Sequence, residues 1–591
     1  MSEPILVAIA WPYASAKIHV GNVTGSHLPG DIFARYQRMA GNRVLMVSGS
    51  DSHGTPITVR AEAEGKTPRE VFEGFHQQFL ELFQRLGITY DLFTHTDTEN
   101  HHRVSQDFFR ALLDHGYLYE ETQEQMFSEA QGRFLPDRYV EGTCPNCGYE
   151  SARGDQCDNC NKLLDPGDLI DPRSALDGST PVLRETVHYF LDLPQLAREG
   201  LSQWLALNKD HWRSTVINFA RNYVNDGLKG RPITRDLEWG IKVPLEGWEK
   251  KCLYVWFEAV IGYFSASVEW ANNQGQPEAW KDWWYDYQAR TFYFIGKDNI
   301  PFHAVIWPAE LMGVKRLYED DASRVLNLPY DVPANEYMNL EGRGMSGSRN
   351  WAVWADEAVE RYGADAVRYY LTVAMPETRD SYWTWEEFVH RNNKELVGTW
   401  GNLAHRALTF AHRRFDGQVP TPGHLDEVDA ALLAKVNDAF DRVAEHLDGC
   451  HFRAALGEAM DLAREANRYL EEKGPWFQIK EDREAAGTTI YVVLRAIDSL
   501  KTLFAPFLPF SSQRLHRYLG YDDQLFGDQY TQTFEEPGGR VHEALCYDGS
   551  EAAGEWKPSQ LPAGQPLREP EPLFESFDEE VIEEERARLG M

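Results

Sequence analysis

The first hundred residues alternate between short apolar runs and amphipathic patterns, and this alternation restricts the fold more than any other feature of the chain. An apolar run at 5–11 precedes a helical stretch that ends near residue 41, and a second apolar run follows at 43–48. Thr67-Pro-Arg-Glu70 is a capping box with proline at the first helical position, and apolar residues at helical spacing then continue to Gly87. Strand, helix, strand and helix with short turns predict an α/β doubly wound, Rossmann-like parallel sheet.

The turn after the first strand enters a polar tetrapeptide, His19-Val-Gly-Asn22. Ligands of doubly wound sheets bind at the carboxyl ends of the strands, where this turn falls. Gly21 would let an adenine ring approach the backbone, and His19 and Asn22 can donate hydrogen bonds to phosphate oxygens near a helix N-terminus. A pattern of four residues is common by chance, so a tight turn with one locally satisfied polar side chain stays an open alternative.

Four of the seven cysteines crowd into residues 144–160 as two Cys-x2-Cys pairs, Cys144 with Cys147 and Cys157 with Cys160. Each pair can direct two thiolates at one point, and two pairs complete a tetrahedron around one zinc ion. Four protein ligands leave no open position, so the predicted zinc is structural. The uneven spacing indicates a reducing cytoplasm and a metal site, not a disulfide framework.

Composition narrows the class of protein further. The formal net charge of −33 argues against generic DNA binding, but residues 390–414 carry five Arg or Lys against one Glu and leave a local nucleic-acid contact open. No apolar stretch approaches the roughly 18 residues of a membrane helix, and the N-terminus shows no secretion signal. We therefore expect a cytoplasmic protein without a membrane contact.

The pattern changes several times along the 591 residues and predicts more than one domain. The cysteine cluster interrupts the alternation, strand-like patterns resume at 252–264 and 291–299, and amphipathic stripes beyond residue 385 predict a helix bundle. The predicted divisions are a first half of the α/β domain at 1–115, an inserted zinc-knuckle module at 116–230, a second half of the α/β domain at 231–325, a connecting region at 326–390, an all-α domain at 391–540 and an acidic tail at 541–591.

Six segments occur in an order that closely resembles the methionyl-tRNA synthetases, a family of class I aminoacyl-tRNA synthetases. The resemblance covers about residues 4–510. It implies that the divisions 1–115 and 231–325 are the two catalytic halves, that 326–390 contacts the tRNA stem and that 391–540 binds the anticodon. The segments are PYASAKIHVGN, SGSDSHGTP, FLPDRYVEGTCPNCG, YVWFEAVIGY, FIGKDNIPFHAVIWPA and NRYLEEKGPW.

The resemblance implies roles for individual side chains. His19 and Asn22 match the first and last residues of the family's HIGH signature, Asp51 matches the residue that holds the α-ammonium group of methionine, and Asp298 matches a residue near the adenosine ribose. Aromatic rings suit a polarizable thioether. The methionine-binding residues implied in this way are Ala10, Trp11, Tyr13, Asp51, Trp256, Ala259, Val260, Tyr263, Asn299 and His303.

The reaction implied by the resemblance has two steps and uses ATP with Mg²⁺. The methionine carboxylate attacks the α-phosphate of ATP, and the terminal ribose of tRNA(Met) then attacks the activated carbonyl, so positioning and electrostatics carry the rate. Asn402, Arg406, Pro475 and Trp476 match anticodon-reading positions, where Trp476 offers a flat face for an unstacked base. Arg406 also lies in the basic stretch found from charge alone.

The family's second signature, Lys-x-Ser-Lys-Ser, is altered in this chain. Its loop reads Arg343-Gly-Met-Ser-Gly-Ser-Arg349, so Met345, Ser346 and Ser348 align but Gly344 and Gly347 replace both lysines. Those lysines normally stabilise the pyrophosphate, and our hypothesis is that Arg343 or Arg349 supplies the missing charge. Trp11, Val260 and Asn299 are smaller departures that bear on the shape of the methionine pocket.

Two functions of other classes remain open at this point. A degenerate paralogue could bind tRNA without aminoacylation, as the glycine-bearing loop suggests. An adenylyltransferase of the wider HIGH superfamily could share the nucleotide turn, although the zinc module and the helix bundle are surplus to that role. The residues after the bundle leave no room for the tRNA-binding β-barrel that many family members append, so we expect a monomer in which 572–584 packs back on the body.

Overall fold

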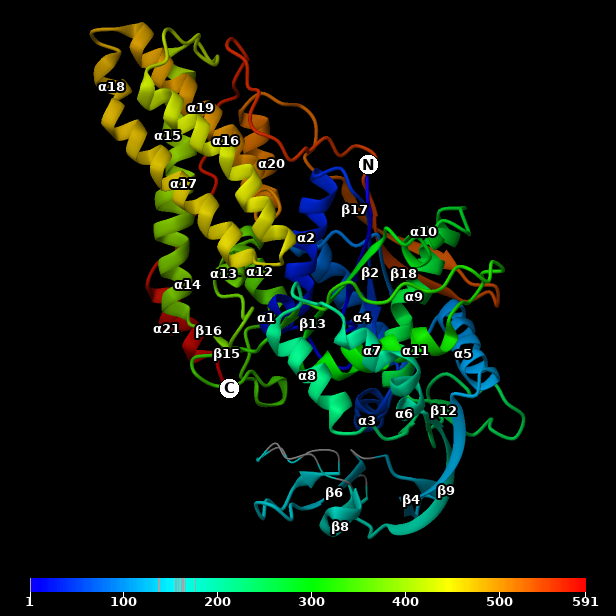
Figure 1. The fold of residues 1–591 in the computed structure, drawn as a ribbon. Helices are drawn as coiled ribbons and strands as arrows, with labels where there is room; N and C mark the ends of the chain where they lie inside the picture. Colours follow the sequence, from blue (N-terminus) through cyan, green and yellow to red (C-terminus); the bar gives the residue numbers. More distant parts are fainter. Residues whose placement is uncertain are drawn as a thin grey trace.

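A seven-stranded sheet forms the centre of the molecule in this computed structural model, which describes residues 2–136, 139–154, 157, 159–160, 164, 166–175 and 177–590, and only the backbone of Ser348. Strand β1 pairs in parallel with β2 and β13, so the predicted doubly wound α/β sheet is confirmed. The spatial order of the strands is β14 (Ala334–Asn335), β13 (Arg290–Gly296), β1 (Pro4–Ile9), β2 (Arg43–Ser50), β3 (Leu92–His95), β18 (Val541–Asp548) and β17 (Asp528–Glu535) (Figure 1).

Both faces of this sheet are covered, which explains why its central strands are apolar without alternation. In β1, Ile5 and Val7 point into one core cluster, and Leu6 and Ala8 into another on the opposite face. The covering helices are α1 (Val20–Asn22), which continues through η1 (Val23–His27) into α2 (Leu28–Met39), and α3 (Thr55–Glu64), α4 (Pro68–Leu86), α5 (Glu99–Asp114), α9 (Val255–Asn273) and α11 (Trp307–Val314). The capping box at Thr67 and the left-handed C-cap at Gly87 of α4 are confirmed.

The strand-like prediction for residues 252–264 is wrong. Only β12 (Cys252–Leu253) is a strand, and helix α9 begins at Val255. Nearly all of α9 is buried between the sheet and its neighbours, so its sequence is apolar on every side and shows no helical period. The strand predicted at 291–299 is confirmed as β13, followed by a short 3₁₀ turn.

A long antiparallel ribbon carries the cysteine-bearing module away from the body, at the bottom of Figure 1. The ribbon consists of β4 (Leu118–Ser128) and β9 (Val182–Leu191), and the module adds β5 (Arg133–Phe134), β6 (Val140–Thr143), β7 (Ala152–Arg153) and β8 (Ile170–Ser174). The next helices, α6 (Leu193–Leu196), α7 (Ser202–Ala206) and α8 (Ser214–Asn225), place buried residues in the same core cluster as the catalytic sheet. Because α6, α7 and α8 pack in the core of the central sheet, the predicted boundary of the inserted module at residue 230 stays a proposal.

Long helices form the bundle at the upper left of Figure 1. The predicted apolar stripe of α16 is buried at Leu432, Val436, Phe440, Val443 and Leu447, and the all-α bundle is confirmed. Its helices are α14 (Trp385–Arg391), which continues through η8 (Asn392–Gly401) into α15 (Asn402–Arg414), then α16 (Glu427–Asp448), α17 (Phe452–Lys473), α18 (Pro475–Gln478), α19 (Arg483–Phe504) and α20 (Pro509–Tyr518).

One buried arginine joins the bundle to the sheet domain through α12 (Ala355–Tyr362) and α13 (Ala364–Val373). Arg368 of α13 donates to Asp31 of α2 at 2.7 Å and to the carbonyl oxygens of Pro506 and Phe507 at the end of α19, and both charged side chains are fully buried. Removing one partner of such a pair leaves a buried charge uncompensated, so this contact holds the two parts in one orientation.

The residues after the bundle return to the body, as predicted for 572–584. The hairpin β17–β18 extends the sheet by antiparallel pairing of β18 with β3. Helix α21 (Glu580–Ala587) lies beside α14. Its Glu585 accepts from Arg361 of α12 at 2.5 Å and from Tyr362 of α12 at 2.7 Å. Among the described residues, no helix has both the length and the apolar composition needed to cross a membrane.

Candidate active site

The HVGN turn starts the continuous helix that follows β1. His19 is its N-cap: Nδ1 accepts from the backbone N–H of Asn22 at 3.3 Å, and Oδ1 of Asn22 accepts from the backbone N–H of His19 at 3.1 Å. Burial lowers the pKa of His19 to about 4, so the ring is neutral near pH 7. Because Nδ1 is an acceptor, the ring proton lies on Nε2, which makes His19 a fixed hydrogen-bond donor.

A cavity of about 420 Å³ lies at this end of the sheet and joins segments that are distant in the sequence. Among the residues predicted for nucleotide or methionine binding, it is lined by Ala10, Trp11, His19, Gly21, Asn22, Asp298, Asn299, Gly344 and Met345. The described lining includes no lysine or arginine, and Glu336 adds a second carboxylate beside Asp298. The cavity therefore suits a nucleotide only if cations arrive with the ligand or from a nearby loop.

The altered signature loop closes one side of this cavity. It follows β15 (Met338–Leu340), and a Cβ on Gly21 would lie 3.0 Å from the His19 ring and 3.4 Å from Sδ of Met345. Gly21 is thus required by close packing as well as by access to a ligand. Arg343 and Arg349 are exposed and do not line the cavity, and the guanidinium of Arg343 lies 5.2 Å from the ring centre of Trp351.

Several predicted methionine-binding side chains contact one another. Tyr13 meets Trp256 edge to face at 5.8 Å. Nδ1 of His303 donates to the carbonyl oxygen of Asn299 at 2.9 Å, so Nε2 accepts from the hydroxyl of Tyr263 at 2.6 Å. Burial lowers the pKa of His303 to about 4, which keeps this ring neutral. These two hydrogen bonds fix the orientation of both rings.

Asp51 lies at the end of β2, directly beside Tyr13 in the neighbouring segment. Its backbone N–H donates to the carbonyl oxygen of Pro12 at 2.8 Å, and its carboxyl oxygen accepts from the N–H of His53 at 3.2 Å. The residue is only 2% exposed. Burial and the carboxylate of Glu258 raise the pKa of Asp51 well above its ordinary value, against the effect of His53. A ligand ammonium group would relieve this unfavourable charge.

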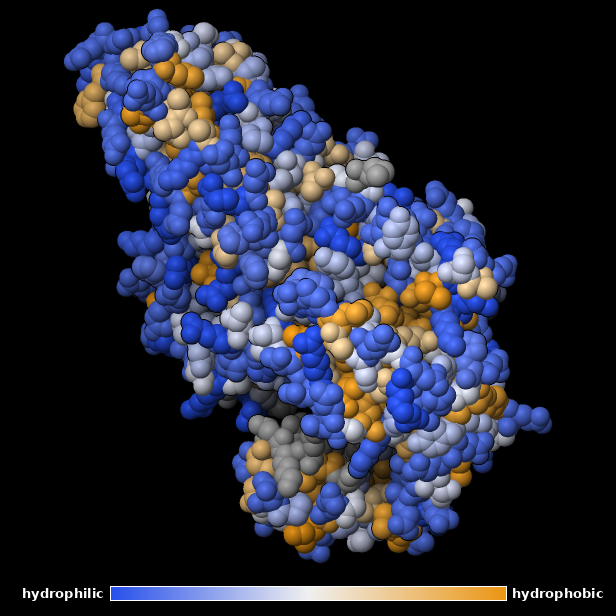
Figure 2. Space-filling model, in the orientation of Figure 1, coloured by the Kyte–Doolittle hydropathy of each residue, from blue (hydrophilic) through white to orange (hydrophobic). Residues whose placement is uncertain are grey.

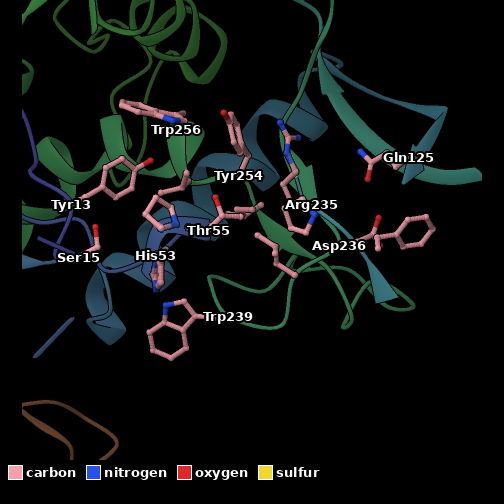
Figure 3. A pocket seen from close by; sticks show the side chains of 17 residues that line it. Tyr13, Ser15, His53, Thr55, Gln125, Arg235, Asp236, Trp239, Tyr254 and Trp256 are labelled. Atoms are coloured by element: carbon pink, nitrogen blue, oxygen red, sulfur yellow. The ribbon is translucent and has the colours of Figure 1, made fainter. Parts of the chain in front are cut away.

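A second cavity, of about 320 Å³, lies between the sheet domain and the cysteine-bearing module (Figure 3). Tyr13, Trp256 and His53 line one side, and Gln125 of the ribbon lies on the other. Five predicted methionine-binding residues are buried and line neither cavity: Asp51, Ala259, Val260, Tyr263 and His303.

Sequence reasoning missed Arg235, the one basic residue of the described lining besides His53. Its guanidinium lies 3.8 Å from the ring centre of Tyr254 and can meet a ligand carboxylate. Arg235 belongs to no local motif. The pairing of β11 (Thr234–Arg235) with β12 brings it to the pocket, and no sequence signal predicted that pairing.

The unusual Trp11 is accommodated by two glycines. A Cβ on Gly49 would come within 2.2 Å of the indole ring, and one on Gly262 of α9 within 2.7 Å. The indole Nε1 is buried without a hydrogen-bond partner, beside the edge of Tyr263 at 6.5 Å. The large ring at position 11 therefore depends on the small residues on both sides of it, and it lines the first cavity.

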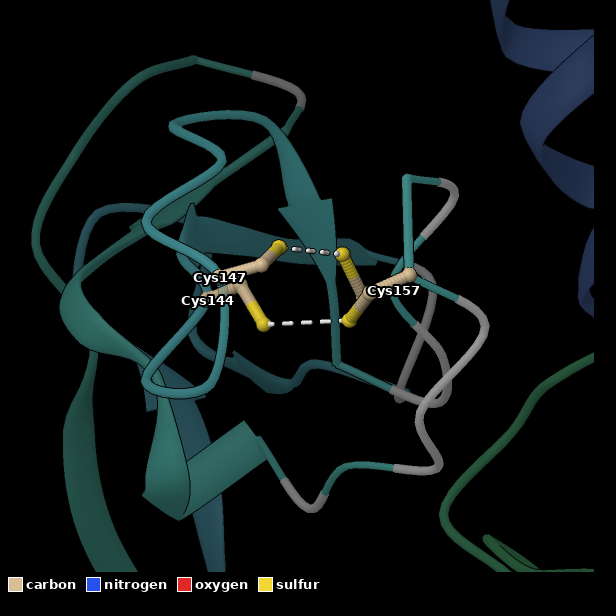
Figure 4. Close-up of side chains that lie close together, drawn as sticks. Cys144, Cys147 and Cys157 are labelled. Carbon is tan, nitrogen blue, oxygen red and sulfur yellow. Dashed lines mark hydrogen bonds between the residues drawn. The ribbon is translucent and has the colours of Figure 1, made fainter.

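The four cysteines of the module converge as predicted (Figure 4). The sulfur atoms of Cys144 and Cys160 are 3.9 Å apart, and those of Cys147 and Cys157 are 3.6 Å apart. A disulfide needs about 2.05 Å, whereas zinc–sulfur bonds of about 2.3 Å give tetrahedral edges of about 3.8 Å. The four thiols fit one tetrahedral metal ion.

The predicted anticodon residues meet at the outer end of the bundle, where Figure 2 shows apolar colour over α18. Asn402 and Arg406 are four residues apart on one face of α15. The Arg406 guanidinium lies 4.7 Å from the ring centre of Trp476 and donates to Glu471 at 3.3 Å, and Pro475 is buried beneath them. Phe477, which was not predicted, is 68% exposed next to Trp476.

Comparison with known proteins identifies the family of this chain. Residues 5–408 match the family model described as tRNA synthetases class I (M), and residues 419–542 match the anticodon binding domain of methionyl tRNA ligase. The fold and the site thus define a class I aminoacyl-tRNA synthetase.

Relatives of known name extend over the whole chain. The methionine–tRNA ligase of Thermomicrobium roseum is 58% identical over 591 residues, and that of Roseiflexus sp. is 55% identical over 597 residues; each alignment covers 100% of this chain and 99% of the relative. The chain belongs to the methionine–tRNA ligase family. The structure of Mycobacterium tuberculosis methionyl-tRNA synthetase in complex with methionyl-adenylate is 25% identical with a TM-score of 0.75, and the match covers 97% of this chain and 100% of that one.

Proposed function

We propose that this protein activates L-methionine with ATP to methionyl-adenylate and transfers the methionyl group to the 3′ end of tRNA(Met). One observation carries the proposal: a single cavity joins the HVGN turn, Asp298 and the altered signature loop in a chain of this family. Neither the degenerate paralogue nor the adenylyltransferase of the wider superfamily is favoured, because full-length relatives are methionine–tRNA ligases.

In the first step, the methionine carboxylate attacks the α-phosphate and pyrophosphate leaves. We assign Nε2–H of His19 and the amide of Asn22 as donors to phosphate oxygens, and Asp298 as the partner of the ribose. Asp51 would hold the α-ammonium group. We assign the thioether pocket to Tyr13, Trp256, Tyr263 and His303, of which Tyr13 and Trp256 line the second cavity and Tyr263 and His303 are buried. Mg²⁺ that enters with ATP would supply positive charge for the phosphates in a cavity whose described lining includes no lysine or arginine. In the second step, a terminal ribose hydroxyl of the tRNA attacks the carbonyl carbon, and AMP leaves.

Methionine-dependent exchange of pyrophosphate into ATP, followed by charging of tRNA(Met), tests this proposal. We expect both activities in the purified protein. Exchange with methionine but no charging would leave a methionine-activating enzyme without transfer, and absence of exchange would reject the function. Leucine and isoleucine are the matched control substrates, because they have similar volumes but no sulfur.

We propose that Arg343 or Arg349 replaces the charge of the missing lysines. Removing one of them should slow adenylate formation by about 10- to 100-fold, because a charge contact in a transition state is worth that much. Arg343 is adjacent to Gly344, and Arg349 is two residues from Gly347. Rapid-quench measurements of Arg343→Ala and Arg349→Ala check this. Lys297, which pairs with Glu336 at 2.8 Å and Asp380 at 2.8 Å, is the cationic control on the same side of the cavity. Wild-type rates in both arginine variants would reject the hypothesis.

We propose that the metal held by Cys144, Cys147, Cys157 and Cys160 is zinc and that it is structural. The all-sulfur donor set and its convergence support zinc, with sulfur–sulfur distances of 3.9 Å for Cys144 and Cys160 and 3.6 Å for Cys147 and Cys157. Elemental analysis of the wild-type protein should give one zinc ion per chain. Cys157→Ser should abolish zinc binding and destabilise the module. Cys450→Ser, in the bundle, is the control and should leave the zinc content unchanged. Full zinc retention in Cys157→Ser would contradict the assignment.

We propose that Asn402, Arg406 and Trp476 bind the anticodon. Arg406→Ala should lower kcat/KM for tRNA by about tenfold to 50-fold, because Arg406 both carries charge and supports the ring of Trp476. Glu471 already neutralises Arg406, so Glu471→Gln should strengthen tRNA binding. Filter binding of tRNA(Met) and pyrophosphate exchange separate the effects, since exchange needs no tRNA. An equal loss of both activities in Arg406→Ala would contradict this role.

We also propose that the protein acts as a monomer in the cytoplasm. None of the seven described cysteines forms a disulfide, which is expected of a protein in a reducing compartment. Light scattering after gel filtration tests the oligomeric state.

A further inference from the structure

The hairpin β17–β18 follows the helix bundle in the sequence, yet its tip lies against the amino-acid side of the proposed active site. Strand β18 pairs with β3, so the tip residues 536–540 reach the segment that follows β3. There the guanidinium of Arg540 donates to Oδ2 of Asp97 at 2.9 Å and also to the carbonyl oxygen of Asp97. Glu536 accepts from Arg540 at 2.8 Å and from the backbone N–H of Glu99 at 3.1 Å.

Asp97 connects this tip to the pocket. Its side chain is 4% exposed, and its second oxygen faces Nε2 of His53 at 3.7 Å and Nε2 of His102 at 3.4 Å. His53 lines the second cavity beside Tyr13 and Trp256, and its backbone N–H donates to Asp51. Two residues, Asp97 and His53, therefore lie between Arg540 and the carboxyl group of Asp51, which we assign to the methionine ammonium group.

The charges along this path are interdependent. Nδ1 of His53 contacts Glu258 at 2.8 Å. Burial alone would lower the pKa of His53, but Glu258 and Asp97 raise it to about 10, so His53 is a cation between two buried carboxylates. Arg69 of α4 also donates to Oδ2 of Asp97, at 2.6 Å. His53, Asp97 and His102 carry metal-ligand atoms, but the two arginines already neutralise Asp97, so the cluster is an ion-pair network.

We infer that Arg540 is a positioning residue for methionine: by fixing Asp97 it holds His53 and, through the His53 N–H, the carboxyl group of Asp51. This inference rests on the proposed function. Its consequence is that a segment from beyond the helix bundle sets the geometry of the amino-acid site. ATP binds at the other cavity, so its affinity does not depend on Arg540.

Steady-state pyrophosphate exchange in Arg540→Gln tests the inference. We expect the KM for methionine to rise about tenfold, as for loss of one charge-assisted hydrogen bond, while the KM for ATP stays within about twofold. Arg540→Lys should recover part of the affinity, because it keeps the charge but not the two-point contact. Asp97→Asn should raise the same KM, and the double variant Asp97→Asn with Arg540→Gln should add nothing further.

Glu535→Gln is the matched control, because Glu535 is an exposed charge on the same hairpin outside the network. It should leave both KM values unchanged. Thermal unfolding of each variant identifies loss of fold, and Arg540→Lys carries the test if Arg540→Gln does not fold. Unchanged KM for methionine in folded Arg540 variants, or equal rises in the KM for methionine and for ATP, overturns the role of Arg540 alone. Absence of exchange in the wild-type protein overturns the proposed function and this inference together.

Discussion

Replacing His19 by alanine should slow formation of methionyl-adenylate by about 100- to 1,000-fold. The imidazole is neutral and its Nδ1 is held by the N–H of Asn22, so Nε2–H is a preorganised donor at the start of a helix. Such donors stabilise charge that develops on phosphate oxygens, and losing one costs about that factor. Rapid-quench measurement of adenylate formation at saturating methionine and ATP checks the rate of the chemical step directly.

His19 is also an N-cap, so the variant loses helix stability of about 1 kcal/mol. His19→Asn separates the two roles, because asparagine caps a helix as well as histidine does but its amide is shorter. We expect His19→Asn to regain the melting temperature but not the rate. A His19→Ala protein with the wild-type rate would remove His19 from the chemistry.

The pKa of His19 also predicts a pH dependence of stability. The pKa is lowered from 6.5 to about 4 in the folded state, so the unfolded chain binds more protons between these values. The wild-type protein should therefore lose this part of its stability as the pH falls from about 6.5 to about 4. Urea unfolding at pH 7 and at pH 5 should show a smaller difference for His19→Ala than for the wild type.

The sequence predicted those helix ends and apolar stripes that depend only on residues close together in the chain. The capping box at Thr67, the glycine C-cap at Gly87 and the stripe of α16 are short-range features, and each appears where the sequence places it. Helix α9 was mistaken for a strand because its burial on all sides removes the periodicity that distinguishes the two. The error came from tertiary packing, which a sequence window does not contain.

Long-range pairing accounts for what the sequence did not predict. The metal ligands were predicted because their spacing alone brings four thiols together. The addition of β17–β18 to the sheet, by contrast, joins residues more than four hundred positions apart, and the approach of Arg540 to Asp97 depends on it. The contacts among the predicted site residues likewise depend on the parallel order of β1, β2 and β13, which brings the ends of these strands to one edge.

Replacing Asp51 by asparagine should raise the KM for methionine by about 100-fold or more and, at the same time, raise the melting temperature of the ligand-free protein. The first effect follows because a buried carboxylate that pairs with an ammonium group is worth several kcal/mol of binding. The second follows from the raised pKa of Asp51. Above the unfolded-state pKa, the unfolded chain releases this proton more readily than the folded protein, so the carboxyl group destabilises the fold at neutral pH, and an amide does not.

Glu310→Gln is the control that separates burial from ligand binding. Glu310 in α11 is fully buried, neither carboxyl oxygen has a hydrogen-bond partner, and burial raises its pKa well above the ordinary value. Its amide variant should also melt at a higher temperature, but its KM for methionine should be that of the wild type. Differential scanning calorimetry and pyrophosphate exchange on both variants decide the matter. If Asp51→Asn melts lower than the wild type, the unliganded carboxylate is already compensated, and if its KM is unchanged, the ammonium group binds elsewhere.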